Sequence, residues 1–375
     1  MLMADFKPRI IFRDPVFDGA ADPTVIKRVS DGKLFMFYTQ RRATLECSGV
    51  EWCYGTKIGA AVCDSFNNWR YVGALTGSPV QGSEAEVAVV NDSPVDCQSR
   101  DLTEPAGETL SRTAESSETE GLYEFKKDCD SSKTNNPSVI LGFASDATSP
   151  YTGEAAGVLR MAEDSHPERS RILKMTDNAT FWAPEVVFDG ESYRMFVTYI
   201  DGVFSEWAGE ASIEQYISPD LLQWRRIGRV EIESARVIDP CLFPLPQGGW
   251  RMWYKDEKRG SRTCFCDTED FESWRSGGFA TDEAAQEGPN VFALGGYYWL
   301  VADVWDGLAV YRSDDLTRFV RQRGNILPGI ASHADVFCEG GSARLVYFTY
   351  PEGGRRSAVC ECGLEVKDGV LKVTQ

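Results

Sequence analysis

Five short stretches of this chain share one pattern of polar and apolar positions. Each begins with a small or polar residue and ends in two apolar residues, and four of the five carry proline at the second place. Strands that occupy equivalent places around a shared centre are typical of such repeats. The stretches are DPTVI from Asp22, APEVV from Ala183, DPCLF from Asp239, GPNVF from Gly288 and HADVF from His333.

The spacing of these stretches predicts the unit to which each belongs. The starts at residues 183, 239, 288 and 333 are 56, 49 and 45 residues apart. A four-stranded blade of a β-propeller has about this length. Residues 22 to 183 span roughly 100 more than one blade needs, which indicates an insertion after the first blade.

A second pattern recurs within each unit. After a turn comes an aromatic-rich run that is typical of the second strand of a hairpin. The five runs are 34–38, 193–197, 250–254, 297–301 and 345–349. Four units also carry an aromatic residue before a fourth strand, whereas the fifth lacks this mark, and residues 8–12 can supply the strand that closes the ring. The sequence therefore predicts an all-β chain, with residues 1–375 forming a single five-bladed β-propeller.

The insertion covers about residues 80–175 and is acidic and polar. Ser, Thr, Glu and Asp dominate it, so it cannot bury enough apolar area to offset its ordering entropy. We expect a partly disordered surface loop, with a lid over the mouth of the propeller as the alternative. Short apolar runs at 86–91, 139–144 and 156–161 can form strands that finish the first blade or a small flap.

Composition narrows the classes of partner. The net charge of -18 and the pI near 4.7 disfavour nucleic acid, anionic lipid and strongly polyanionic polysaccharide. The eleven cysteines include no CxxC pair, which indicates reduced thiols and disfavours a thiolate zinc site. No apolar stretch reaches the length of a membrane span, and the first residues lack the order of a signal peptide. These features predict a cytoplasmic protein with a neutral substrate.

The order of the repeated motifs resembles a known group of enzymes. Asp22-Pro23, Phe181-Trp-Ala-Pro-Glu185, Ile238-Asp-Pro240, Glu287-Gly-Pro289 and Ser332-His-Ala-Asp335 are similar to motifs of five-bladed propeller glycosidases. The resemblance is to glycoside hydrolase family 43 and its relative, family 117, and covers all of the chain except the insertion. It implies an inverting glycoside hydrolase in which Asp22 is the general base, Asp239 orients the acid and tunes its pKa, and Glu287 is the general acid.

The chemistry of the repeat favours the same three residues independently. Inner strands of a propeller converge near the axis, so carboxyl groups at equivalent positions of blades one, three and four share one cavity. Crowded carboxylates cannot all ionise, and one pKa is raised, as a general acid requires. The alternative for each Asp before a proline is that it merely caps a turn.

Six further residues are candidates for contact with the sugar: Gln40, Arg41, Trp182, Glu185, Trp305 and His333. Trp182 can stack on a sugar or pack between blades. Glu185 can accept a bond from a sugar hydroxyl or serve as a structural hydrogen-bond partner. Gln40, Arg41 and Trp305 stand in tracts that are not general marks of family 43, so they are candidates for specificity.

No cofactor is required by this chemistry. The resemblance implies an axial water or a structural calcium ion near His333, although a lone histidine suits calcium poorly and more often bonds a neighbouring carboxylate.

Three functions compete at this point. The leading one is an exo-acting hydrolase of short oligosaccharides. A propeller glycoside phosphorylase would need a cluster of Arg, Lys and His at the mouth. A non-catalytic glycan-binding propeller would not need Asp22, Asp239 and Glu287 together.

Overall fold

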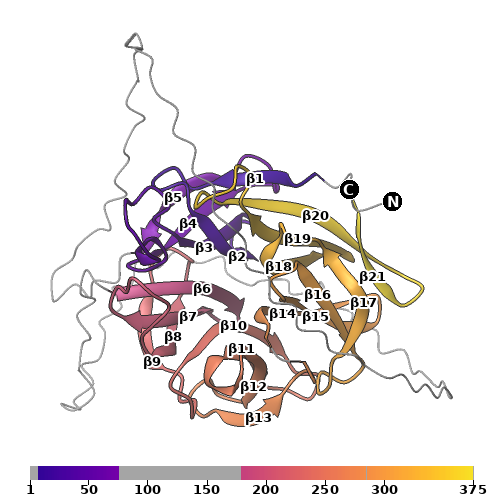
Figure 1. Ribbon diagram of the computed structural model, residues 1–375. Helices are drawn as coiled ribbons and strands as arrows, with labels where there is room; N and C mark the ends of the chain where they lie inside the picture. Colours follow the sequence, from indigo (N-terminus) through magenta and orange to yellow (C-terminus); the bar gives the residue numbers. More distant parts are fainter. Residues whose placement is uncertain (1–6, 76–178, 284, 375) are drawn as a thin grey trace, which may run out of the picture. The chain divides into compact units, whose positions relative to one another are not determined.

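The structure, a computed structural model, describes residues 7–75, 179–283 and 285–374. In this part of the chain, the strands form five antiparallel sheets around a common centre (Figure 1). The predicted all-β, five-bladed β-propeller is confirmed. The predicted insertion at about 80–175, with its short apolar runs, lies outside the described residues.

Four blades take their strands in chain order, from the inner strand outward. The first blade consists of β2 (Ala20–Lys27), β3 (Leu34–Gln40), β4 (Lys57–Cys63) and β5 (Arg70–Leu75). The second consists of β6 (Ala179–Phe188), β7 (Tyr193–Asp201), β8 (Ala211–Ser218) and β9 (Arg225–Arg229). The third consists of β10 (Val237–Pro244), β11 (Trp250–Asp256), β12 (Arg262–Thr268) and β13 (Arg275–Phe279). The fourth consists of β14 (Glu287–Leu294), β15 (Tyr297–Asp303), β16 (Leu308–Ser313) and β17 (Val320–Leu327).

The fifth blade joins the two ends of the described chain. It contains β18 (Ser332–Glu339), β19 (Ser342–Thr349) and β20 (Ala358–Lys367). The early strand β1 (Arg9–Arg13) pairs with the first half of β20, and β21 (Val370–Thr374) pairs with its second half. The predicted closing strand is thus confirmed, and it covers an edge that would otherwise expose unpaired backbone groups.

The helical segments of the described part are the short turns η2 (Glu51–Cys53) and η3 (Glu257–Arg259). No helix among the described residues has the length and apolar character needed to cross a membrane.

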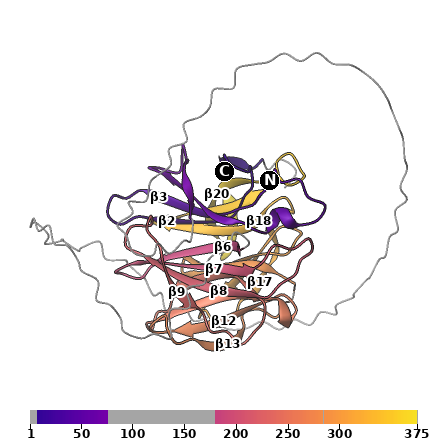
Figure 2. The ribbon, with the colours of Figure 1, turned by 90° about the vertical axis from the view of Figure 1, so that its left-hand side faces the viewer.

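The inner strands form a closed ring of contacts. β2 contacts β6 and β18, β10 contacts β6 and β14, and β14 contacts β18. In the side view of Figure 2, β6 to β8 of the second blade lie next to β12 and β13 of the third. Apolar cores fill the spaces between neighbouring blades. Phe37 and Met195 belong to the core between the first and second blades, and Trp299 and Tyr347 to that between the fourth and fifth.

The first residue of every repeated stretch has a left-handed backbone. The φ angles are 48° at Asp22, 46° at Ala183, 58° at Asp239, 54° at Gly288 and 30° at His333. Each inner strand also shifts its pairing register at this point. This irregularity explains the prolines of the repeat, because proline is tolerated within a sheet chiefly at bulges and edges. It also turns the first side chain of each stretch out of the regular ladder.

The third residue of each stretch links one blade to the next. Four of these side chains accept a hydrogen bond from a backbone N–H of the following blade, in each case that of the fourth residue of its repeated stretch. The pairs are Glu185 with Leu242, Cys241 with Val291, Asn290 with Val336 and Asp335 with Val25. The fifth, Thr24, donates to Glu185 at 3.3 Å. These residues are buried, so the four bonds from backbone N–H groups satisfy donors that water cannot reach.

Candidate active site

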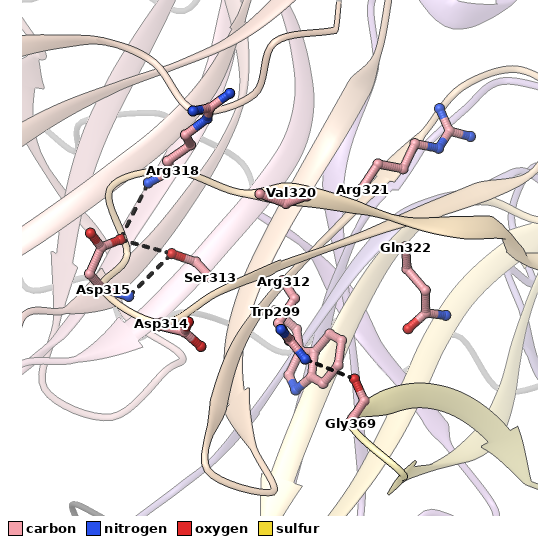
Figure 3. A pocket seen from close by; sticks show the side chains of 10 residues that line it. All are labelled: Trp299, Arg312, Ser313, Asp314, Asp315, Arg318, Val320, Arg321, Gln322 and Gly369. Carbon is pink, nitrogen blue, oxygen red and sulfur yellow. Dashed lines mark hydrogen bonds between the residues drawn. The ribbon is translucent and has the colours of Figure 1, made fainter. Parts of the chain in front are cut away.

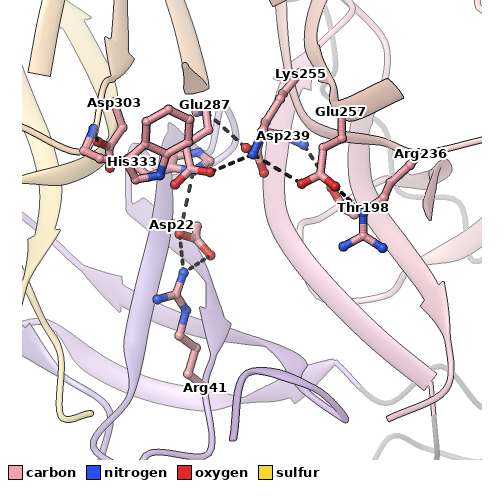
Figure 4. A network of polar contacts seen from close by, with 12 residues as sticks. Asp22, Arg41, Thr198, Arg236, Asp239, Lys255, Glu257, Glu287, Asp303 and His333 are labelled. Carbon is pink, nitrogen blue, oxygen red and sulfur yellow. Dashed lines mark hydrogen bonds and ion pairs between the residues drawn. The ribbon is translucent and has the colours of Figure 1, made fainter. Parts of the chain in front are cut away.

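Three of the first residues of the repeated stretches, Asp22, Asp239 and His333, line one cavity. Its volume is about 520 Å³, and Asp22, Asp239, Glu287, Asp303 and Glu257 supply carboxyl groups to its lining. The remaining lining residues are Arg41, Cys53, Trp182, Trp207, Ile238, Lys255, Trp305, Ser332, His333, Phe348 and Tyr350. Figure 4 shows the polar part of this site. The structure therefore brings together the three carboxyl groups that the sequence selected.

Asp22 is buried and held by a cation. Its Oδ1 and Oδ2 atoms accept hydrogen bonds from Arg41 Nη2 at 3.1 and 3.3 Å. Arg41 is fixed in turn by its bond to Tyr350 Oη at 2.7 Å. His333 Nδ1 lies 3.7 Å from Asp22 Oδ1 on the other side. A carboxylate paired in this way is suited to accept a proton from water.

Asp239 bridges the third and fourth blades. Its backbone N–H donates to Thr198 Oγ1 at 3.0 Å, and its Oδ2 accepts from the Gly288 N–H at 3.1 Å. Burial is the main cause that raises the pKa of Asp239 to about 6, with Glu287 and Asp22 adding to the effect and His333 opposing it. From the sequence, crowding was expected to raise the pKa of the general acid, whereas in the structure the raised carboxyl pKa values of this cavity are those of Asp239 and Asp303.

Glu287 stands one residue before its repeat position and belongs to a chain of charges. Its Oε2 accepts from Lys255 Nζ at 2.9 Å, and the same Nζ lies 3.2 Å from Glu257 Oε1. Glu257 is also paired with Arg236. Burial alone would lower the pKa of Lys255, but Glu287, Asp239 and Glu257 outweigh it and raise that pKa. Lys255 is therefore a cation between two carboxylates.

Asp303 adds a further buried carboxyl group beside Glu287. The two residues pair across β14 and β15. Asp303 Oδ1 accepts from the Trp305 N–H at 2.7 Å, and Oδ2 accepts from the His333 N–H at 3.4 Å. Burial, together with the charge of Glu287, raises the pKa of Asp303. This residue positions the loop that carries Trp305.

Aromatic side chains form the apolar part of the lining. Trp182 is buried and donates its indole N–H to the Cys53 carbonyl at 2.6 Å. Trp305 and Trp207 are instead 54% and 63% exposed while they line the cavity. Trp305 belongs to the fourth blade and Trp207 to the second. Such exposed indole faces are suited to stack on the C–H face of a sugar.

Two predicted sugar contacts do not line the cavity. Gln40 is buried and donates its amide to Asp14 Oδ1 at 2.8 Å and to Tyr71 Oη at 3.2 Å. Glu185 lies in the ring of third-position side chains, where it accepts from the Leu242 N–H at 3.0 Å. Glu185 is therefore a structural hydrogen-bond partner, which the sequence analysis gave as the alternative to contact with a sugar hydroxyl. Arg41, Trp182, Trp305 and His333 do line the cavity.

The surroundings of His333 do not fit a calcium ion. Calcium requires six or more oxygen ligands, whereas the carboxylate oxygens nearest His333 already accept from Arg41 and from backbone N–H groups. Within the described ranges, no group of three or more His, Cys, Asp or Glu side chains is arranged to hold a metal ion.

A second cavity, of about 430 Å³, lies on the outer strands of the fourth blade (Figure 3). Its arginines are engaged elsewhere: Arg318 with Asp282, Arg321 with Glu283, and Arg312 with the Gly369 carbonyl. Asp315 caps its own turn by accepting from the Thr317 N–H. The three arginines and Asp315 are thus held in structural contacts.

Sequence reasoning did not select Lys255, Glu257, Asp303 or Trp207 as site residues. Lys255 and Asp303 stand at one position of the second strand, opposite the residue before each repeated stretch. Lys255 directly follows the aromatic run 250–254 and Asp303 lies two residues after the run 297–301, so both stand just outside the runs that the sequence marked. Trp207 and Glu257 follow the second strands of their blades in connections, where the repeat gives no alignment.

Comparisons with known proteins test the fold. A scan against models of protein families finds no match, and no curated protein matches by sequence. Many solved structures do match. A thermostable family-43 glycoside hydrolase aligns with a TM-score of 0.56 and 16% identity over 97% of this chain and 96% of its own. The chain has the fold of family 43 glycoside hydrolases.

Two other structures with this fold extend the comparison. An exo-1,5-α-L-arabinanase from a bovine ruminal metagenomic library aligns with a TM-score of 0.53 and 14% identity, over 95% of this chain and 97% of its own. A family 43 β-1,3-galactosidase with galactodeoxynojirimycin aligns with a TM-score of 0.57 and 11% identity, over 99% of this chain and 98% of its own. The likeness to the family 43 fold that the sequence indicated is confirmed, and the low identities leave the activity to the site itself.

Proposed function

We propose that this protein is a glycoside hydrolase that acts on oligosaccharides, with Asp22 as general base and Glu287 as general acid. The observation that carries the proposal is the convergence of Asp22, Asp239 and Glu287 in one cavity, at the unequal positions of a repeated strand start. Glycoside hydrolases commonly use a pair of carboxyl groups, one on each side of the glycosidic bond that is cleaved.

The chemistry follows from these positions. Glu287 gives its proton to the glycosidic oxygen as the bond from that oxygen to the anomeric carbon breaks. Asp22 takes a proton from a water molecule whose oxygen forms the new bond to the same carbon. The reaction then inverts the anomeric centre, and Asp239 orients the acid through the backbone at Gly288.

Exo action on a neutral sugar is the form we propose. A cavity of about 520 Å³ has the size of a small-ligand site. The exposed faces of Trp207 and Trp305 supply stacking surfaces at its lining, and the five carboxyl groups disfavour an acidic substrate.

The pairing of the cationic side chains with carboxylates favours hydrolysis over phosphorolysis. Arg41, Lys255 and His333 are the cluster that a phosphorylase would need, and all three line the cavity. However, Arg41 is paired with Asp22, and Lys255 with Glu287 and Glu257. A phosphate ion would have to displace these carboxylates.

A panel of aryl glycosides and oligosaccharides tests the proposal, with xylosides, arabinofuranosides and galactosides included. We expect release of one sugar unit at a time, with the inverted anomer visible by NMR before mutarotation. Adding phosphate should neither accelerate turnover nor yield a sugar phosphate. Binding without turnover across the panel would favour a glycan-binding propeller instead.

The E287Q variant tests the acid assignment. We expect turnover of oligosaccharides to fall by about 10²- to 10⁴-fold, and to fall less for aryl glycosides whose leaving group needs little protonation. E339Q is the matched control, because Glu339 is an exposed residue of β18 that pairs with Lys27. Equal losses across leaving groups would contradict the assignment.

A further inference from the structure

Lys255 departs from a pattern that three of the other four blades follow. One position of each second strand pairs with the residue before the repeated stretch of its blade, and it is occupied by Thr39, Thr198, Lys255, Asp303 and Phe348. In three blades this side chain accepts a hydrogen bond from the first N–H of the next blade. Thr39 accepts from Ala183 at 2.8 Å, Thr198 from Asp239 at 3.0 Å and Asp303 from His333 at 3.4 Å.

A lysine cannot perform this task, because an ammonium group has donors and no acceptor. The Gly288 N–H of the next blade is instead bonded by Asp239 Oδ2 at 3.1 Å. Lys255 therefore takes no part in these bonds to backbone N–H groups, although its side chain is only 6% exposed. Buried lysines are rare unless they are paired, so the reason for this residue must lie in its partners.

Those partners are two carboxylates with different surroundings. Lys255 Nζ lies 2.9 Å from Glu287 Oε2 and 3.2 Å from Glu257 Oε1, and the Trp305 ring lies 5.5 Å from the same atom. Glu257 is backed by Arg236, which also donates to the Ala208 carbonyl at 2.7 Å. Glu257, itself held by Arg236, therefore keeps the lysine beside Glu287 whichever protonation state Glu287 adopts.

We propose that Lys255 is a positioning residue that fixes the Glu287 carboxyl group and sets its affinity for the proton, while Glu257 limits how strongly it does so. The inference rests on the proposed function only in naming Glu287 as the acid. When Glu287 is ionised, the lysine bonds both carboxylates. When Glu287 is protonated, its carbonyl oxygen still accepts from Lys255, and the charge of the lysine is balanced by Glu257.

Other charged groups face Glu287 and remain unchanged in the test. They are the carboxyl groups of Asp239 on β10, Asp303 on β15 and Asp22 on β2, with His333 on β18 and Arg41 on β3. Their effect is common to all variants compared below, so a difference between variants reports Lys255 and Glu257.

The test is a titration of the Glu287 carboxyl group by ¹³C NMR, with the signal assigned through its loss in E287Q. In K255M, which removes the charge and keeps an unbranched side chain one atom shorter, we expect the titration midpoint of Glu287 to rise by about 1 to 3 pH units. In E257Q we expect it to fall, because the lysine then has Glu287 as its remaining carboxylate partner within 4 Å. K255R should stay near the wild type, and K258M, at an exposed lysine of η3, should not differ from it.

The alkaline limb of the pH profile of kcat/KM should move in the same directions, upward in K255M and downward in E257Q. A lysine that only stabilises the fold would lower the melting temperature of K255M and leave both midpoints unchanged, which overturns the inference. If E287Q retains full activity, the acid assignment fails, whereas the NMR midpoints still decide whether Lys255 controls this carboxyl group.

Discussion

The carboxylate of Asp239 on the third blade accepts a hydrogen bond from the backbone N–H of Gly288 on the fourth, at 3.1 Å. Gly288 follows Glu287 directly, so one bond joins the orienting residue to the peptide that carries the proposed acid. Asp239 thus acts on Glu287 through the backbone as well as through its charge.

The raised pKa of Asp239 predicts a pH-dependent stability difference. The folded state binds this proton more tightly than the unfolded state, whose ordinary pKa is 3.8, so stability is lost as the pH rises from about 4 through about 6. D239N cannot ionise, and its amide oxygen can still accept from Gly288. Relative to the wild type, D239N should therefore gain stability between pH 4 and pH 7, by about 3 kcal/mol at most.

Denaturant unfolding at the two pH values measures this difference. Asp270 offers a control of opposite sign, because backbone N–H groups of Ser273 and Glu272 lower its pKa. D270N should lose stability relative to the wild type as the pH rises toward about 4, and its difference from the wild type should change little between pH 4 and pH 7. If D239N and the wild type keep a constant difference across this range, Asp239 is not protonated in the folded state near pH 5.

Loss of the proposed base should abolish turnover and leave binding largely intact. In D22N, the amide cannot accept the proton from water, so we expect kcat to fall by about 10²- to 10⁴-fold. D31N is the control, since Asp31 is a surface partner of Arg28. Calorimetry with an unhydrolysed sugar should show affinity within about tenfold of the wild type, and kcat near the wild-type value would show that Asp22 is not the base.

Gly288 is required both by its backbone angle and by its neighbour. Its φ is 54°, and a Cβ atom placed there would lie 2.7 Å from Cγ of the His333 ring. Gly296 has a φ of 82° and nothing within 4 Å of the same position. G296A should cost about 1 to 2 kcal/mol from the left-handed backbone alone.

G288A should cost more than this control, because His333 must move, and it should also lower kcat because Glu287 is adjacent. Thermal unfolding and steady-state kinetics of the two variants separate these effects. Equal melting temperatures would show that the His333 ring accommodates the methyl group without strain.

Trp207 is held in place by contacts of its ring and of the adjacent backbone. The following residue, Ala208, exchanges two hydrogen bonds of 3.0 Å with Tyr54 Oη, and the Trp207 ring packs 6.0 Å from that of Trp182. We expect W207A to raise KM for oligosaccharides by about 5- to 30-fold, as the loss of about 1 to 2 kcal/mol of stacking implies. Aryl glycosides of one sugar should be less affected. L222A, at an exposed leucine that does not line the cavity, is the control, and an unchanged KM for long and short substrates would contradict this role.

The five repeated strand starts determined most of the fold. Each begins with a small or polar residue, in four of the five followed by proline, and ends in two apolar residues, and each first residue has the same left-handed backbone. The closing strand at 8–12 was also predictable, because a fifth blade without its outer mark leaves an edge that needs a partner. The choice of Asp22, Asp239 and Glu287 came from the same repeat, since equivalent positions converge on one axis.

Tertiary structure decided which polar residues face the cavity. Gln40 and Arg41 are adjacent in the sequence, yet Gln40 turns to Asp14 and Tyr71 while Arg41 reaches Asp22, because successive side chains of a strand point to opposite faces. Glu185 bonds the next blade through a contact between distant segments. The charge chain from Glu287 through Lys255 to Glu257 and Arg236 joins separate blades and connections, and no local pattern encodes it. The sequence by itself determined the repeat and its unequal members, whereas packing of the blades determined their partners, because those contacts exist only once the ring has closed.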